Sequence, residues 1–134
     1  MHKLGVPVTG AKMTDTSGLS ASNRVPPITL VETLAQATSS DRPQLRAILS
    51  GMPVADVSGT LAYRFGSKAQ RSAAGVVRAK TGTLTGVNAL AGMLVDADGR
   101  MLVFAAMADK VTSTTTTIAR LDDLAATLAS CGCR

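Results

Sequence analysis

The residues best suited to chemistry lie in one short run, Lys80-Thr81-Gly82-Thr83, shortly after the apolar pair Val76-Val77. Lys80 supplies a compact positive charge with three hydrogen-bond donors. The hydroxyl of Thr81 can hold a carboxylate, and Gly82, which lacks a side chain, lets a ligand come close to the backbone. On an edge strand, an unpaired amide of this run could also stabilise an oxyanion. The run therefore suits a substrate with a terminal carboxylate beside a reacting carbonyl.

A strand must carry this run for the groups to converge. Alternation along a strand would place Lys80 and Gly82 on one face and Thr81 and Thr83 on the other. A lysine that is buried or half-buried there would favour anions and shift nearby pKa values. Lys-Thr-Gly by itself consists of three common residues. The valine-rich segment before it and the Thr-Leu-Thr-Gly turn at 83–86 make its context more specific.

The second half of the chain, residues 76–134, predicts three strands and a closing helix. The strands are expected over 76–81, 87–95 and 101–107, and the Asp-Gly pair at 98–99 is a strong hairpin signal. The third strand is apolar almost throughout and should need cover on both faces. After a Thr/Ser-rich entry, apolar residues recur near helical spacing at Ile118, Leu121, Leu124, Ala125 and Leu128.

The first half, residues 1–75, predicts loops and short helices. The first 25 residues are rich in turn and capping residues. Pro26 and Pro27 suit the start of a helix, because proline is tolerated where the amide has no helical partner. The expected apolar face of that helix consists of Ile28, Leu30, Val31, Leu34 and Ala35.

Two shorter elements are expected before the second half. A helix should begin near Asp41 and end at Gly51, and a further short helix should follow over 58–65. Residues 68–75 read as a polar connector. The expected fold class is therefore α+β: short helices, then a three-stranded antiparallel meander and a closing C-terminal helix.

Composition limits both the core and the partners. Only 2% of the 134 residues are aromatic, so the core lacks large anchors and we expect it to depend on surface outside the chain. The net charge is +5, but the basic residues are dispersed, with no zinc-ligand spacing and almost no aromatic surface. Specific nucleic-acid binding is therefore not expected. A positive field suits work near an anionic polymer or surface.

The ends of the chain carry few signals. Cys131 and Cys133 are too close for an easy mutual disulfide, and with His2 as the single histidine we expect no metal site. Either thiol could pair with a cysteine outside the chain or stay free on the terminal tail. No apolar signal region is visible, and no run reaches the roughly 20 apolar residues of a membrane span. If the protein is exported, we expect its signal to lie upstream.

Three blocks of the sequence resemble one enzyme family. Residues 78–92 resemble the Lys-Thr-Gly region of the D-alanyl-D-alanine carboxypeptidase/endopeptidases, the class C penicillin-binding proteins of peptidase family S13 (DacB-like). Residues 15–24 resemble that family's Asp-x-Ser-Gly-Leu-Ser stretch, and residues 52–61 resemble its Leu-Pro-x-Ala-Gly-x-Asp-Gly-Thr-Leu stretch. The blocks stand in the family's order and cover most of the chain.

The resemblance implies a fold and a reaction. Residues 1–134 would form the C-terminal part of a penicillin-binding/β-lactamase-like transpeptidase domain. In this family a serine attacks the D-Ala-D-Ala bond of a peptidoglycan stem peptide, and water hydrolyses the acyl-enzyme. β-Lactams would acylate the same serine in the complete enzyme, and no metal or organic cofactor is implied. The complete protein would act in the periplasm, at the cell envelope or outside the cell.

The resemblance also implies residue roles. Lys80 would stabilise charge and help to poise the proton relay, and Thr81 would bind the terminal carboxylate of the substrate. The backbone amide of Thr83 would form one arm of the oxyanion hole. Gly82 and Leu84 would lie beside the bound substrate.

The family's nucleophile motifs are missing from this sequence. No serine is followed by lysine three positions later, and no Ser-x-Asn occurs, although Ala21-Ser22-Asn23 comes close. In the family both motifs precede the Ser-Gly-Leu-Ser block. We therefore expect a C-terminal portion that is inactive alone. It would associate with the missing N-terminal part, or with itself, through apolar surface on its sheet.

Other interpretations stay open at this stage. The chain could be a non-catalytic remnant or a fragment that binds peptidoglycan. Ser17 and Ser20 could be proposed as nucleophiles, but hydroxyls that cap a loop explain them better. Asp15 and Arg24 could form a pair that orders this loop, or could be solvated charges.

Overall fold

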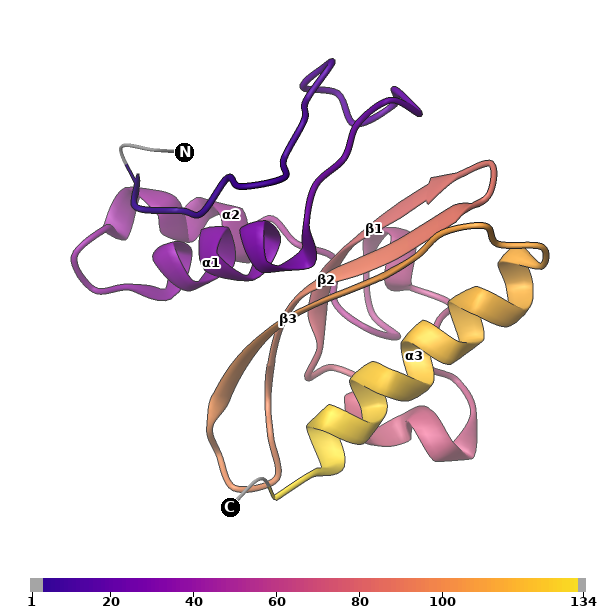
Figure 1. The fold of residues 1–134 in the computed structure, drawn as a ribbon. Helices are drawn as coiled ribbons and strands as arrows, with labels where there is room; N and C mark the ends of the chain where they lie inside the picture. The colour runs from indigo at the N-terminus through magenta and orange to yellow at the C-terminus, as the bar shows by residue number, and fades with distance from the viewer. Residues whose placement is uncertain (1–3, 133–134) are drawn as a thin grey trace.

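The chain folds around a three-stranded antiparallel sheet (Figure 1). This computed structural model describes residues 4–132. The strands, in their spatial order, are β1 (Arg78–Leu84), β2 (Val87–Val95) and β3 (Met101–Ala108). The α-helices are α1 (Pro27–Thr38), α2 (Arg46–Ser50) and α3 (Thr114–Ser130). Short 3-10 turns are η2 (Pro43–Leu45), η3 (Gly59–Leu61) and η4 (Lys68–Ala73). The expected α+β order, with a meander and a closing helix, is confirmed.

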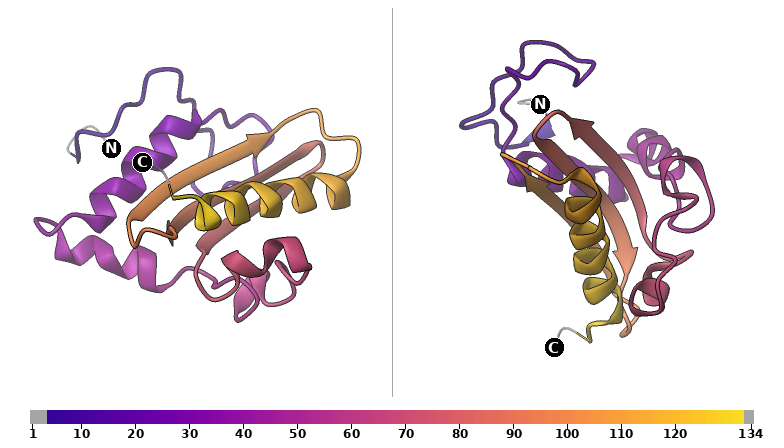
Figure 2. Two further views of the ribbon diagram at one scale, coloured as in Figure 1. Left: turned by 90° about the horizontal axis from the view of Figure 1, so that it is seen from below. Right: turned by 90° about the vertical axis from the view of Figure 1, so that its right-hand side faces the viewer.

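The sheet lies between α1 and α3 (Figure 2). Alternate residues of β2 are buried, among them Leu90 and Leu94, and they join Leu121 and Ala125 of α3 in one apolar cluster. Helix α1 packs on the opposite face of β2 and β3. The cover that the apolar third strand requires is therefore supplied by one helix on each face.

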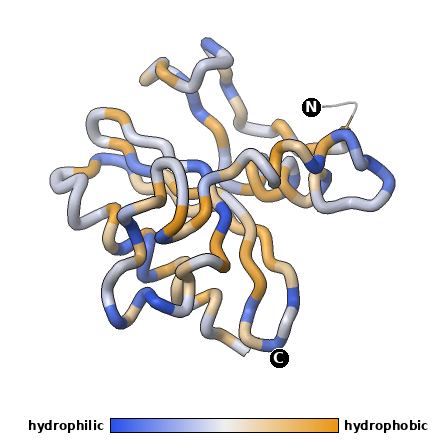
Figure 3. Tube along the Cα trace, turned by 180° about the vertical axis from the view of Figure 1, so that it is seen from behind, coloured by the Kyte–Doolittle hydropathy of each residue, from blue (hydrophilic) through white to orange (hydrophobic). Residues whose placement is uncertain are grey.

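The turn between β2 and β3 is built around one carboxylate. Asp96 accepts hydrogen bonds from the amides of Asp98 and Arg100 and from the Arg100 guanidinium. These bonds, the Arg100 amide foremost, lower the pKa of Asp96. Figure 3 shows the hydrophobic strands β2 and β3 meeting at this hydrophilic tip.

Strand β1 begins later than the sequence predicts. The amide of Val77 donates to the carbonyl of Ala73 at 3.0 Å. The carbonyl of Val77 accepts from the amide of Ala55 at 2.9 Å. Val76 and Val77 therefore end the preceding turn, and Val77 is fully buried in the core. The strand starts at Arg78 and extends to Leu84, so the prediction of a strand over 76–81 was wrong at both ends.

Several helix predictions also needed correction. Ile28 was expected on the apolar face of α1, yet it is 52% exposed. Thr29 is buried instead, and its hydroxyl is satisfied by donating to the carbonyl of Pro7. In α3 the expected core residue Leu124 is largely exposed, and the charged residue Asp122 is buried instead. The short helix expected over 58–65 is only the turn η3, and the connector contains η4.

Helices α1 and α3 cover much of the apolar sheet surface that we expected to be open, and the expected association through that surface stays a prediction. The exposed large apolar residues of the sheet lie near strand ends, at Val87, Val95, Met101 and Met107. Within residues 4–132, no helix is both long enough and apolar enough to cross a membrane.

Replacing Gly92 by alanine should strongly destabilise the fold. An added Cβ would lie 2.0 Å from the carbonyl oxygen of Arg78 and 2.6 Å from the Cα of Ala79, so β1 itself would have to move. Such overpacking typically lowers the free energy of unfolding by about 1–3 kcal/mol, which urea unfolding of the chain measures. Gly66→Ala is the matched control, because nothing lies within 4 Å of its added Cβ. If the two variants lost the same free energy of unfolding, this would contradict the close approach of β1 to β2.

Candidate active site

The outer edge of β1 is paired at its beginning and open further along. The amide of Ala79 donates to the carbonyl of Pro53 at 3.0 Å, on the side away from β2. In an antiparallel strand, the backbone groups of alternate residues point to the same side, so those of Thr81 and Thr83 also point away from β2. Within residues 4–132, no acceptor bonds the Thr83 amide on this side. The Thr81 amide has no acceptor there either, so the edge offers unused N–H donors at Thr81 and Thr83.

Lys80 lies on the surface rather than in a buried position. Its side chain is exposed, because α1 packs over β2 and β3 and leaves this part of β1 uncovered. Lys80 is therefore not the buried or half-buried lysine that would shift nearby pKa values. Its Nζ donates to the carbonyl of Thr81 at 2.7 Å, and no carboxylate of the described chain forms an ion pair with it. The ammonium is thus held at the edge of β1 with its charge uncompensated.

Thr81 is half-buried, and its hydroxyl donates to the hydroxyl of Thr60 on η3 at 3.1 Å. Thr83 is exposed, and its hydroxyl accepts from the amide of the buried Asn88 at 3.4 Å. Both threonines are therefore tied to neighbouring elements through their side chains.

The fold does not require glycine at position 82. A Cβ added to Gly82 would meet only the Cβ of Ala89, at 3.4 Å, which is an ordinary contact. Gly82 is exposed, so its missing side chain leaves the backbone accessible between Lys80 and Leu84. Leu84 is half-buried at the end of the strand.

All five predicted site residues line one groove of about 780 Å³. Its other walls are formed by the loop 17–25, by η3 and the residue Arg64 after it, and by parts of β2 and β3. The groove therefore combines cationic, hydroxyl and amide groups from β1 with an apolar surface. Its further lining residues include Leu19, Leu30, Val87, Met107 and Ile118.

The loop beside this groove is organised by Asp15. Its carboxylate accepts from the side chains of Asn23 and Ser17 and from the amides of Gly18 and Ser20. These hydrogen bonds, the one from Asn23 foremost, lower the pKa of Asp15. The Ser17 hydroxyl thus forms a hydrogen bond within the loop, in agreement with a capping role.

Arg24 contributes to the same loop without pairing with Asp15. Its guanidinium donates to the carbonyls of Ala21 and Asn23 at 2.8 and 2.7 Å. Among the salt bridges of residues 4–132, none joins Asp15 and Arg24.

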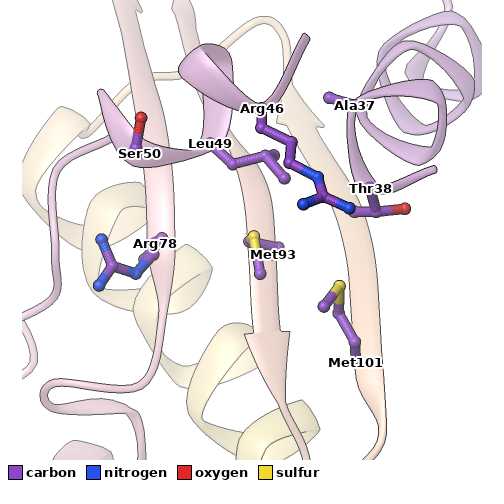
Figure 4. A pocket seen from close by; sticks show the side chains of 8 residues that line it. All are labelled: Ala37, Thr38, Arg46, Leu49, Ser50, Arg78, Met93 and Met101. Atoms are coloured by element: carbon purple, nitrogen blue, oxygen red, sulfur yellow. The ribbon is translucent and has the colours of Figure 1, made fainter. Parts of the chain in front are cut away.

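A second, smaller hollow of about 400 Å³ lies on the face of the sheet that carries α1 (Figure 4). Arg46 and Arg78 flank an apolar floor that contains Leu49, Met93 and Met101. None of the predicted site residues lines this hollow. The groove at the edge of β1 is therefore the candidate active site.

Thr60 and Arg64 are two polar groove residues that were not predicted as site residues. Thr60 reaches Thr81, and the guanidinium of Arg64 is held by the buried Asp122 of α3, with its Nε 3.1 Å from both carboxylate oxygens. The block 52–61 contains Thr60 but assigns it no role, and Arg64 lies after that block.

The remaining sequence candidates lie away from the groove or outside the described chain. Cys131 is partly buried beyond the end of α3, whereas His2 and Cys133 lie outside the described residues. Over residues 4–132, no three His, Cys, Asp or Glu side chains gather as ligands for a metal ion.

Comparison with known proteins places the chain in a family. Residues 1–130 match the D-Ala-D-Ala carboxypeptidase 3 (S13) family. The chain is 45% identical over 134 residues to carboxypeptidase DacB of Mycolicibacterium smegmatis, covering 99% of this chain and 29% of that protein. It is 42% identical over 103 residues to the D-alanyl-D-alanine carboxypeptidase of Actinomadura sp. (strain R39), covering 73% of this chain and 18% of that protein.

A solved structure shares the fold. Penicillin binding protein 4 (dacB) of Haemophilus influenzae, complexed with a β-lactam, superposes with a TM-score of 0.77 at 27% identity, covering 92% of this chain and 29% of that one. The chain thus spans less than a third of the length of these relatives. The transpeptidase-like fold expected from the resemblance is confirmed, and the chain belongs to the D-Ala-D-Ala carboxypeptidase 3 (S13) family.

Proposed function

We propose that this chain forms the Lys-Thr-Gly wall of a serine D-Ala-D-Ala carboxypeptidase/endopeptidase that acts on peptidoglycan stem peptides at the cell envelope. The observation that carries the proposal is the open edge of β1. Along four residues it presents the uncompensated ammonium of Lys80, the hydroxyl of Thr81 and the unused amide of Thr83. All three residues line the same groove.

Each group answers one need of the reaction. The hydroxyl of Thr81 binds the terminal carboxylate of the substrate, and the charge of Lys80 favours that anion. The amide of Thr83 donates to the oxyanion that develops on the scissile carbonyl oxygen. Gly82 leaves room for the substrate backbone against β1, and Leu84 contacts the substrate beyond it.

The nucleophile comes from residues outside these 134. Its hydroxyl oxygen forms an ester with the carbonyl carbon of the penultimate D-Ala, and the C–N bond breaks as the leaving amine takes a proton. Water then hydrolyses the ester and restores the serine. A β-lactam undergoes the same first step, because the serine oxygen attacks the carbonyl carbon of its strained amide bond and that bond opens.

A chimera tests this proposal. In it, the present chain replaces the matching segment of the Mycolicibacterium smegmatis carboxypeptidase DacB, to which it is 45% identical. We expect the chimera to form a covalent adduct with a fluorescent penicillin and to release D-Ala from a D-Ala-D-Ala peptide. The isolated 134-residue chain should form no adduct.

Lys80→Ala in the chimera should reduce both reactions. Lys110→Ala is the matched control, because Lys110 is an exposed lysine outside the groove. A chimera that is folded by circular dichroism yet unreactive would contradict the proposal. So would an adduct on the isolated chain, since it would require a different nucleophile.

A further inference from the structure

We infer that Thr60 is a positioning residue that aims the hydroxyl of Thr81 at the substrate carboxylate. The inference rests on the proposed function and extends it to a second element, the turn η3. The two hydroxyl oxygens are 3.1 Å apart, and Thr60 lies in the groove beside the outer edge of β1. No other hydrogen bond within the described chain involves the Thr60 side chain.

The segment that carries Thr60 is fastened to β1 before the groove begins. Ala79 donates to Pro53, Ala55 donates to Val77, and Val54 forms a bridge with Arg78. This segment thus runs along the same edge of β1 that opens further on at Thr83.

The turn itself is held at both ends. The amide of Asp56 donates to the carbonyl of Leu61 at 3.0 Å, and the Leu61 side chain is fully buried in the core. The hydroxyl of Ser58 accepts from the amide of Val54 at 3.0 Å. Thr60 therefore reaches Thr81 from a fixed backbone rather than from a free loop.

The arrangement matches what a hydroxyl must do when it binds an anion. A hydroxyl has one donor and two acceptor positions. In the structure, Thr81 donates to Thr60. When a carboxylate arrives, Thr81 turns its proton to the anion, and Thr60 can then donate to the freed Thr81 oxygen. Hydrogen bonds in such a chain polarise one another, so Thr60 both orients Thr81 and strengthens its bond to the carboxylate.

The test compares two substrates of the chimera that differ only at the C-terminus. One is a D-Ala-D-Ala peptide with a free carboxylate, and the other is the same peptide with a C-terminal amide. Thr60→Val keeps the side-chain shape and removes the hydroxyl. We expect it to raise KM for the free acid about threefold to tenfold, the factor that one net hydrogen bond supplies, with kcat nearly unchanged. The KM for the amide substrate, which has no carboxylate to bind, should change little.

Two further variants separate positioning from a structural role. Thr60→Ser restores the hydroxyl and should restore the preference for the free acid. Thr85→Val is the matched control, since Thr85 is an exposed threonine in the turn after β1 and does not line the groove. It should leave both substrates unchanged.

The outcomes distinguish this inference from the proposed function. If Thr60→Val raised the KM for the acid and for the amide substrate by the same factor, the positioning role would be overturned. If Thr81→Val raised the KM for the free acid and Thr60→Val did not, the positioning role would be overturned as well. The proposed function would stay intact. If Thr81→Val itself left the KM for the free acid unchanged, the proposed binding of the carboxylate by Thr81 would be wrong.

Discussion

Thr83→Pro in the chimera should lower kcat for a D-Ala-D-Ala peptide about 10²–10³-fold, the usual loss when one oxyanion-hole donor is removed. Proline lacks the backbone N–H, which at Thr83 points away from β2 and bonds nothing else in the described chain. The sheet itself should tolerate the change, because proline is accepted on an edge strand where the N–H faces outward.

Thr83→Ala separates the amide from the side chain. It keeps the N–H and removes the side-chain methyl group and the hydroxyl that accepts from Asn88. We expect this variant to retain most of the activity, and both variants to unfold at similar urea concentrations. Comparable kcat values for the alanine and proline variants would assign the oxyanion donor to another group.

The second large effect concerns stability. Arg64→Leu should lower the free energy of unfolding by about 3–5 kcal/mol at pH 7, because it leaves the buried carboxylate of Asp122 without its partner. The side chain of Asp122 is 5% exposed, and both its oxygens lie 3.1 Å from the Nε of Arg64. Urea unfolding of the single variants and of Arg64→Leu/Asp122→Leu measures the effect. The double variant should recover most of the loss, because no buried charge remains.

The loss in Arg64→Leu should shrink as the pH falls. Burial raises the pKa of Asp122 above its ordinary 3.8, and Arg64 opposes that rise. Without Arg64 the pKa of Asp122 in the folded chain rises further. A carboxyl with a raised folded pKa binds its proton more tightly in the folded state, so stability is lost as the pH climbs from 3.8 through the folded pKa. A loss that stayed constant between about pH 7 and about pH 4.5 would contradict this account.

Local pattern in the sequence predicted the order of the elements and the β1 residues that line the groove. Alternating and continuous apolar runs, with Asp-Gly between two of them, are sufficient to indicate a meander, because a strand's period and a tight turn are properties of neighbouring residues. The resemblance around Lys80 likewise needed only adjacent residues. For that reason residues 80–84 could be predicted to form one site from the sequence alone, and all five of them line the groove.

Contacts between distant segments decided the rest. Val76 and Val77 look like a strand, yet bonds to Ala73 and Ala55 hold them in a turn, so β1 starts at Arg78. Burial of Asp122 depends on Arg64, 58 residues earlier. Neither relation leaves a periodic signal, because each joins side chains or backbone groups of separate elements.

The sequence by itself therefore predicted which residues of β1 form the candidate site, since strand period and residue type are local properties. Only the tertiary structure decided how they are presented. It left Lys80 exposed because α1 packs over β2 and β3, and it brought Thr60 to Thr81 across 21 positions of the chain. Both results depend on how separate elements pack, and packing between elements is set by the whole core rather than by any single run of residues.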